Sequence, residues 1–479
     1  MAADEGLRER ERRSPWLPVL LSIAIVVCAL AFARLALPPA PHAGEPVKKR
    51  TESSVWPPTG KRVGSSVRAT PDRADDRITV SVMTLGNELT HEQIAEFEAQ
   101  NPDTRIAFFE HSSNLLDILL ATNDLPDVFR LGQVEDHSLV ERGLLLDITD
   151  RIAHSKLLSL ADMRGETAAD VSVDGRYYGL PQGLSTPDFT SLYVNTAALE
   201  RAGIPMPRLD EPLTYAELAE LASALTAKTG RPAFYSYFFE RTLTAALVQR
   251  GGRMFNDDFS AMTLIDNPKA LEVLRYFYDL GVTGAMYIPP ATPGIAFMFE
   301  NGELPISQSG YWMGTVVTPA TPAYGHVTML LPPVWDRRLP RVASYLGGTK
   351  LVISSTSNHP DQAYRFIEWY VAGKPAAERA RRGWGFPLLR AMEALLPSET
   401  EFDRQRLRVA LDSLKLPVAR LPLYPYPDIL PAFNQSWTRN MALAKSGRIK
   451  FEVFASNLQE DVNLAIQDDM TSRHARAQR

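Results

Sequence analysis

The order of strands and helices within residues 77–132 most restricts how this chain folds. Residues 77–84 alternate in polarity and are rich in β-branched side chains, and residues 105–109 and 127–132 form two further short apolar runs. Two helical stretches separate these three strands. A strand–helix–strand–helix–strand order predicts a parallel sheet with helices on both faces.

Helix-start signals recur along the chain. Thr90 is followed three residues later by Gln93, and Thr214 by Glu217, so each pair forms a capping box. The stretch 267–281 has Asn at the cap, Pro at the first helical position and Gly281 past the predicted end. We therefore expect helices that begin at these positions.

Two carboxyl-terminal helices are predicted from periodicity. Residues 359–373 and 451–470 both carry apolar residues on one face. The first helix follows an apolar strand at 347–355. A second α/β series therefore follows the first without a disordered linker, which predicts two packed lobes with a ligand cleft between them.

The amino end carries a targeting signal. Residues 16–33 are apolar and uncharged, and four arginines precede them. The run is long enough for a membrane span, and the arginines favour a cytoplasmic amino end. We expect an uncleaved anchor; the alternatives are a signal peptide cut after Ala33 and, with less support, a lipoprotein signal at Cys28, where Val26 and Val27 replace the usual small residue.

Composition excludes several classes of function. The net charge of −5 and the pI of about 6.0 give no basic stripe, so no nucleic-acid partner is expected. The single cysteine leaves the rest of the chain without a disulfide or a thiol nucleophile. The 8 histidines show no metal-ligand spacing, and the stretch at 91–95 lacks the second histidine of a zincin helix. We expect no metal, no cofactor and no catalytic residue.

A set of phrases in a fixed order carries a family resemblance. They are ITVSVMT, LPDVFRLG, ERGLLLDIT, DGRYYGLP, LYVNTAALERAGI, PLTYAELAELASAL, GGRMFNDD, FMFENGELPISQSGYW, LGGTKLVISS and QAYRFIEWYV. Together they resemble the extracellular solute-binding proteins of family 1, the carbohydrate-binding group that includes maltose-binding protein and serves ATP-binding cassette importers. The resemblance covers roughly residues 77–397.

The resemblance implies an α/β two-lobed clamp, each lobe a mainly parallel sheet flanked by helices, preceded by one amino-terminal transmembrane or signal helix. The chain would cross the hinge near 181–187, 341–345 and 388–391. The expected segments are a cytoplasmic basic end (1–15), an anchor or signal segment (16–33), a Pro-rich disordered linker (34–76), N-lobe parts at 77–187 and 341–390, and C-lobe parts at 188–340 and 391–479.

The resemblance also implies candidate ligand-binding residues. Trp312 and Trp384 match positions where the family has cleft aromatics, although either could be a core residue. Gln182 and Ser185 lie where sugar binders often carry a carboxylate, which leaves the exact ligand open. Further candidates, each with the alternative of a packing or solvated role, are Asn87, Gln133, Tyr311 and Tyr345.

The predicted function is capture of a carbohydrate by a monomeric, extracytoplasmic binding protein that is anchored to the cytoplasmic membrane, or free in the periplasm if the segment is cleaved. Its expected partners are the permease subunits of an ATP-binding cassette importer. The alternatives are a membrane-tethered sensor that reports a solute without transport and, with less support, a carbohydrate-active enzyme.

Overall fold

The computed structural model describes residues 76–86, 88–132, 136–163, 172–182, 191–237, 239–288, 295–345, 349–420 and 429–477. The predicted segment at 16–33 and most of the predicted linker at 34–76 lie outside these ranges. Among the described residues, no helix combines the length and the apolar character that a membrane crossing needs. The anchor stays a prediction.

The first sheet forms the core of the N-lobe. Its strands, in spatial order, are β2 (Thr104–Glu110), β1 (Ile78–Thr84), β3 (Val128–Leu131), β12 (Lys350–Ile353) and β6 (Gly179–Pro181). Successive side chains enter different apolar clusters: Val82 packs with residues of the helices α2 and α12, whereas Met83 packs with residues of α3. Because side chains alternate across a strand, the sheet is covered by helices on both faces.

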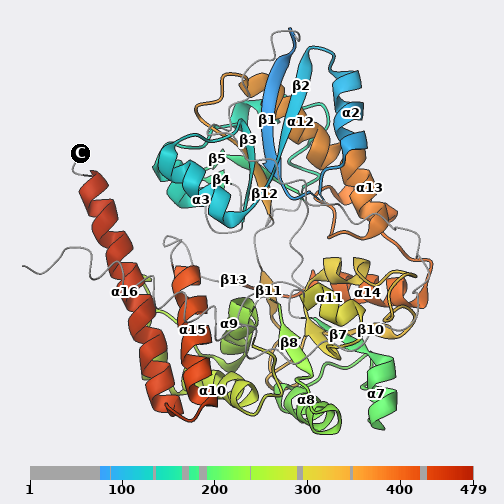
Figure 1. Ribbon diagram of the computed structural model, residues 1–479, viewed down its shortest axis with the longest axis vertical. Helices are drawn as coiled ribbons and strands as arrows, with labels where there is room; N and C mark the ends of the chain where they lie inside the picture. Colours follow the sequence, from blue (N-terminus) through green and yellow to red (C-terminus); the bar gives the residue numbers. More distant parts are fainter. Residues whose placement is uncertain are drawn as a thin grey trace, which may run out of the picture. The chain divides into compact units, whose positions relative to one another are not determined.

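The N-lobe helices pack on this sheet and on one another. Helix α12 contacts β1, β6 and β12, and α13 packs on α12 (Figure 1). The elements are α2 (His91–Gln100), α3 (Ser113–Thr122), α4 (Asp136–Glu141), α5 (Thr149–Ala153), the hairpin β4 (Ser172–Val173) and β5 (Arg176–Tyr177), α12 (Pro360–Ala372), α13 (Lys374–Arg382) and the 3-10 helix η3 (Arg390–Leu395).

The second sheet forms the core of the C-lobe. Its strands, in spatial order, are β10 (Val327–Leu330), β7 (Leu192–Asn195), β9 (Ile306–Gln308) and β8 (Phe234–Ser236). Helices α15 and α16 lie side by side in this lobe (Figure 1). The other elements are α7 (Thr196–Ala202), α8 (Tyr215–Thr229), α9 (Phe239–Arg250), η1 (Leu264–Asp266), α10 (Pro268–Val282), α11 (Ile295–Glu300), η2 (Tyr311–Thr315), the strand pair β11 (Ala343–Tyr345) and β13 (Val418–Arg420), α14 (Glu401–Ser413), α15 (Ile429–Lys445) and α16 (Phe451–Ala477).

The prediction of mainly parallel sheets is right for strand direction, with one exception in each sheet. Strands β1, β2, β3 and β6 run one way and β12 runs against them, and strands β8, β9 and β10 run one way and β7 runs against them. Each of these two strands is the first that the chain enters on arriving from the other sheet. It begins at the edge where its neighbours end, and therefore runs against them. The seven segment boundaries stay predictions.

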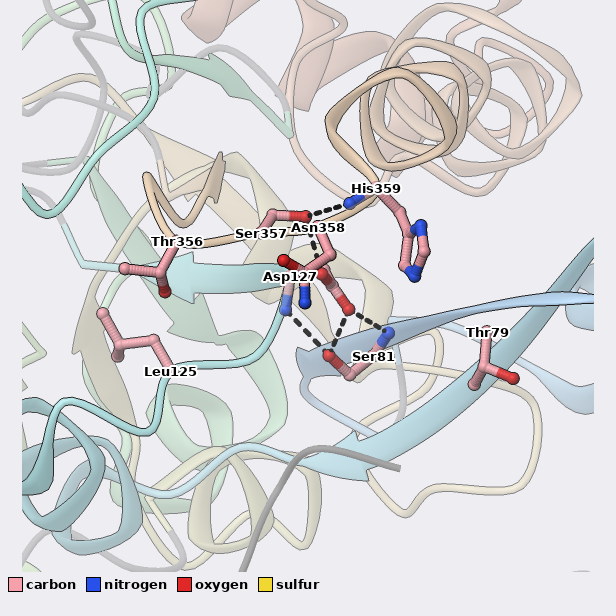
Figure 2. Close-up of a pocket in the computed structure, with 8 residues that line it drawn as sticks. All are labelled: Thr79, Ser81, Leu125, Asp127, Thr356, Ser357, Asn358 and His359. Atoms are coloured by element: carbon pink, nitrogen blue, oxygen red, sulfur yellow. Dashed lines mark hydrogen bonds between the residues drawn. The ribbon is translucent and has the colours of Figure 1, made fainter. Parts of the chain in front are cut away.

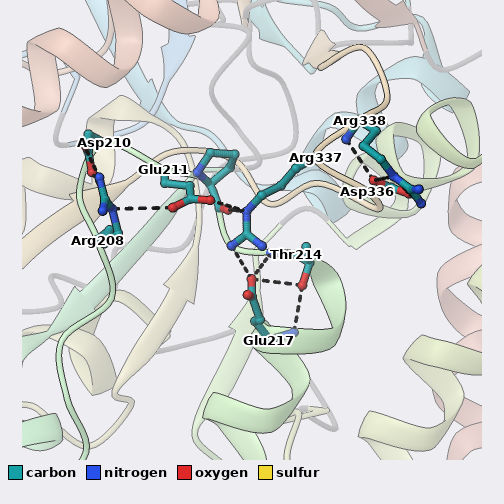
Figure 3. Close-up of polar contacts among 9 residues, drawn as sticks. Arg208, Asp210, Glu211, Thr214, Glu217, Asp336, Arg337 and Arg338 are labelled. Atoms are coloured by element: carbon teal, nitrogen blue, oxygen red, sulfur yellow. Dashed lines mark hydrogen bonds and ion pairs between the residues drawn. The ribbon is translucent and has the colours of Figure 1, made fainter.

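The predicted capping boxes are confirmed at Thr90 with Gln93 and at Thr214 with Glu217. Glu217 also accepts a hydrogen bond of 2.6 Å from Nη2 of Arg337, which follows β10, as Figure 3 shows. The start of α8 is therefore tied both to its own cap and to a distant loop.

The predicted end of the helix at 267–281 is wrong by a small margin. Asn267 caps α10 as expected, but the helix continues to Val282, and Gly281 lies inside it. A Cβ atom at Gly281 would lie 2.7 Å from the sulfur of Met441 on α15. This glycine makes room for a neighbouring helix and does not terminate its own.

The edge of the N-lobe sheet where β1 and β3 begin is closed by Asp127. Its carboxylate accepts hydrogen bonds from the backbone N and the hydroxyl of Ser81, at 2.9 and 2.6 Å, and from the hydroxyl of Ser357 at 2.6 Å. These residues line a pocket of about 100 Å³ near the start of α12 (Figure 2). Because the carboxylate accepts from Ser81 on β1 and from Ser357 after β12, the cluster joins β1, β3 and the turn after β12.

Candidate ligand-binding site

Several strand ends of the N-lobe sheet meet at one edge. Lys350, which begins β12, is paired with Leu131 at the end of β3 and with Pro181 at the end of β6. Thr84 ends the neighbouring strand β1. Ligands of α/β proteins bind beyond the carboxyl ends of such strands, so this edge is where a site is expected.

A hydrogen-bonded group of polar side chains occupies this edge. We call it the polar edge; it consists of Thr84, Glu88, Arg130, Gln182 and Thr349. The Glu88 carboxylate lies 3.1 Å from Nε of Arg130 and accepts hydrogen bonds from the Thr84 hydroxyl at 2.6 Å and from the Gln182 amide at 3.3 Å. Thr349 donates to Oε1 of Gln182 at 3.0 Å. The side chains of Glu88 and Arg130 are only 7% and 16% exposed, so the pair is held in a partly dry environment.

Side chains of helices α12 and α13 hold the backbone of the polar edge. The hydroxyl of Tyr370 donates to the backbone carbonyl of Glu88 at 2.6 Å, and burial raises the pKa of this hydroxyl to about 12. Arg379 lies with its guanidinium carbon 4.1 Å from the centre of the Tyr370 ring and donates to the carbonyls of Tyr370 at 2.7 Å and Gln182 at 3.4 Å. Burial, and next the charge of Arg130, lower the pKa of nearby His111, which favours its neutral form.

A second group is aromatic. We call Trp312, Trp384 and Tyr237 the aromatic cluster. The ring centroids of the two tryptophans are 6.2 Å apart with planes tilted by 57°, and Tyr237 meets Trp312 edge-on at 5.0 Å. All three side chains are half-buried. Each side chain therefore keeps part of its surface exposed, and Tyr237 and Trp312 also pack against the apolar cluster that contains Phe299 and Met313.

The local backbone conformation sets where the two tryptophans lie. Trp312 lies in η2, which follows directly after β9, and the hydroxyl of Thr315 donates to its carbonyl at 2.7 Å. Trp384 follows Gly383, which ends α13 in the left-handed conformation with φ of 68°. Glycine adopts this conformation without steric cost, so it permits the sharp change of direction that presents Trp384.

Helix α13 joins the two groups. The backbone N of Trp384 donates to the carbonyl of Arg379 at 3.0 Å, and Arg379 itself donates to the carbonyl of Gln182. Arg379 therefore connects the backbone of Trp384 to that of Gln182 by two hydrogen bonds, one at its carbonyl and one at its guanidinium.

The C-lobe sheet contributes buried polar residues beside the aromatic cluster. Gln308 at the end of β9 and Ser236 at the end of β8 are paired, and both are buried. The backbone N of Tyr237 donates to the carbonyl of Gln308 at 2.9 Å. The strand ends of the C-lobe thus position Tyr237, and through it Trp312.

The predicted site residues have different outcomes. Gln182 lies in the polar edge, and Trp312 and Trp384 lie together in the aromatic cluster. Tyr311 is 1% exposed and packs against Phe386 at 5.8 Å, so it presents little surface to a ligand. Tyr345 ends β11, and Asn87, Gln133 and Ser185 lie outside the described residues. Contact of any of these residues with a ligand stays a prediction.

Sequence reasoning did not identify Glu88, Arg130 or Tyr237. Arg130 had a usable signal, a charge inside the apolar run at 127–132. A carboxylate does lie next to Gln182, that of Glu88 from the turn between β1 and α2. The described residues contain no cluster of His, Cys, Asp and Glu side chains suited to a metal ion.

Comparisons with known proteins agree with this architecture. The model of the family described as bacterial extracellular solute-binding protein matches residues 92–394. A search among curated proteins finds no match.

Solved structures share the fold. An ABC substrate-binding protein from Listeria monocytogenes in complex with cycloalternan is 20% identical, with 82% of this chain and 100% of that chain covered and a TM-score of 0.70. Maltose-bound MalE3 from T. maritima is 19% identical, with 81% of this chain and 99% of that chain covered and a TM-score of 0.65. The acarbose-binding GacH receptor of Streptomyces glaucescens is 19% identical, with 81% of this chain and 98% of that chain covered and a TM-score of 0.64. The fold is thus an α/β two-lobed solute-binding fold, and because the family model spans well over half of the chain, this protein belongs to the bacterial extracellular solute-binding protein family.

Proposed function

We propose that this protein binds a carbohydrate between the aromatic cluster and the polar edge, outside the cytoplasm, and delivers it to an ATP-binding cassette importer. The observation that carries the proposal is the pair of half-buried tryptophans, Trp312 and Trp384, whose rings are 6.2 Å apart; Trp384 is connected to Gln182 of the polar edge through Arg379.

The chemistry of the two groups suits a sugar. A pyranose ring presents flat C–H faces, which pack on aromatic rings, and hydroxyls at its rim, which need hydrogen-bond partners. The Glu88 carboxylate has about four lone-pair sites, and the described contacts use three donors, so it retains acceptor capacity. The amide of Gln182 is oriented beside it by Thr349.

The solved relatives support the same ligand class. The T. maritima, Listeria and Streptomyces proteins are described with maltose, cycloalternan and acarbose, which are all carbohydrates. We propose that the present site takes a carbohydrate through its own residues and binds it without turnover.

Closure and delivery complete the proposal. A ligand that touches both lobes stabilises a closed form by its differential affinity, so the two lobes act as a hinge. The closed form is the one recognised by the permease subunits of the importer. The segment at 16–33 anchors the monomer to the cytoplasmic membrane with the folded part outside.

Isothermal titration of the full-length protein with maltose, acarbose and cycloalternan tests the proposal, with mannitol and xylo-oligosaccharides in the same panel. We expect saturable binding of at least one carbohydrate, loss of affinity in Trp384→Ala, and recovery of the sugar unchanged by chromatography. The matched control is Trp437→Phe, because Trp437 is only 4% exposed in the C-lobe core and should not alter affinity. Absence of binding across the panel, or binding that Trp384→Ala leaves unchanged, would contradict the proposed site, and hydrolysed sugar would point to an enzyme.

A further inference from the structure

Arg406 makes the same contact with the two segments that carry the tryptophans. Its Nη2 donates to the carbonyl of Tyr311 and to the carbonyl of Gly383, both at 3.2 Å. Tyr311 directly precedes Trp312, and Gly383 directly precedes Trp384. One nitrogen atom on α14 therefore fixes the peptide group before each tryptophan.

The space for this guanidinium is created by glycines. A Cβ atom at Gly314 would lie 2.3 Å from the guanidinium carbon of Arg406, and a Cβ atom at Gly383 would lie 2.7 Å from Nη2. Arg406 is only 2% exposed. Both loops are thus folded tightly around the side chain, and any other residue at these glycines would push it away.

The direction of the guanidinium is itself fixed. Its central carbon lies 4.2 Å from the centre of the Tyr311 ring and 5.4 Å from that of Phe402, and Nη1 lies 3.7 Å from the carboxylate of Asp403. Asp403 also completes the capping box at the start of α14. The cation is therefore held by two aromatic faces and by the first turn of its own helix.

We infer that Arg406 is a positioning residue for ligand binding: by holding the two carbonyls it sets the distance and tilt between Trp312 and Trp384. This inference rests on the proposed function, because it assigns Arg406 a role in affinity without contact with the ligand. The planar guanidinium suits the task, because a single nitrogen serves two acceptors while the flat face stacks on an aromatic ring. A lysine ammonium has no such face.

A double-mutant cycle tests the role. Acarbose is the probe, with titrations of the wild type, Arg406→Met, Trp384→Ala and the double variant. We expect Arg406→Met to weaken binding by about tenfold or more, since its charge-assisted hydrogen bonds are strong ones, and to have little further effect once Trp384 is absent. Arg406→Lys should recover part of the loss. An equal loss in both backgrounds would overturn the inference, because Arg406 would then act independently of the tryptophans.

Near-ultraviolet circular dichroism gives a readout that needs no ligand. Two indoles 6.2 Å apart and tilted by 57° should couple electronically, and we expect this signal to disappear in Trp384→Ala. We expect Arg406→Met and Arg406→Lys to reduce it, and Arg408→Met to preserve it. Arg408 is the matched control because it lies on the same helix and donates to a different carbonyl, that of Leu209, at 2.6 Å.

The outcomes separate the two proposals. If the wild type binds no sugar in the panel while the tryptophan signal depends on Arg406, the proposed function fails and the positioning role stands as geometry alone. If acarbose binds but both Arg406 variants keep the wild-type spectrum, the positioning role is wrong. Should Arg406→Met fail to fold, Arg406→Lys carries both measurements.

Discussion

At the scale of the residue, the described tryptophans differ in burial and in neighbours. Trp369 and Trp437 are 7% and 4% exposed and lie within the apolar cores, and the half-buried Trp335 packs on the C-lobe core, whereas Trp312 and Trp384 are half-buried and lie beside each other. A core tryptophan contributes mainly to the free energy of unfolding. We expect the half-buried pair, Trp312 and Trp384, to contribute to binding instead.

Trp312→Ala should therefore weaken binding more than it lowers stability. We expect a loss of binding free energy on the order of 1–3 kcal/mol, a range borrowed from aromatic residues that stack on nucleic-acid bases. Titration with acarbose and the melting curve of the unliganded protein separate the two effects. Unchanged affinity combined with a collapsed melting temperature would show that Trp312 is a core residue.

Glu88→Gln should destabilise the N-lobe, because Arg130, whose side chain is only 16% exposed, then loses its carboxylate partner. We expect a loss of roughly 2–3 kcal/mol, below the ~3–5 kcal/mol of fully buried pairs, since water still reaches Arg130. Denaturant unfolding measures it. Glu452→Gln, which removes the exposed partner of Arg275, is the control and should change little. Equal effects of the two variants would show that the polar edge is no more than a surface ion pair.

How far the site follows from the sequence depends on the residue. Trp312 ends one of the phrases that resemble a family, Gln182 directly follows another, and Trp384 is assigned by its place in the family order, so their positions could be transferred. Glu88, Arg130 and Arg406 come from three separate elements, and what brings them to the site is strand register and helix packing. Local sequence does not encode either.

At the scale of the element, helix starts were predictable because a cap is a local signal. The boxes at Thr90 and Thr214 satisfy backbone N–H groups within three residues, so the sequence alone contains the interaction. The predicted helix end at Gly281 was wrong because the residue that requires a glycine there, Met441, lies on α15, far away in the sequence. The reversed directions of β7 and β12 were also missed, since they follow from where the chain enters each sheet.

The start of α8 should respond to acid. A hydrogen bond from Arg337, followed by those of Thr214, lowers the pKa of Glu217 from its ordinary value of 4.5 (Figure 3). A lowered pKa means that the ionised form stabilises the fold above the ordinary value, and that this contribution is lost as the pH falls through the lowered value. The advantage of the wild type over Glu217→Gln should therefore be full at neutral pH and be lost as the pH falls from 4.5 through the lowered pKa.

Melting temperatures of both proteins across this pH range measure the effect. Glu217 is 40% exposed, so solvent screening keeps the difference small. Glu220→Gln, an exposed position on the same helix, serves as the control and should track the wild type. A constant gap between wild type and Glu217→Gln at all pH values would show that the carboxylate charge plays no part.

At the scale of the whole molecule, the proposed hinge predicts that the radius of gyration depends on whether the ligand is bound. Small-angle scattering of the protein with and without acarbose should show a smaller radius of gyration in the bound state, because a ligand shared by both lobes favours the closed form. Trp384→Ala at the same acarbose concentration should remain closer to the unliganded size. An unchanged radius in a sample that calorimetry shows to be saturated would contradict hinge closure.

The place of β12 in the N-lobe sheet also affects how the chain reaches its fold. Residues Lys350–Ile353 lie between β3 and β6, and most of the C-lobe sequence is synthesised before they emerge. Closing so long a loop is slow, and in the meantime β3 lacks its partner β12 and the sheet face that packs on α12 is only partly covered. The nascent N-lobe should therefore remain open to chaperones and compatible with passage through a translocon, and it acquires its final stability only after the C-lobe strands have been made.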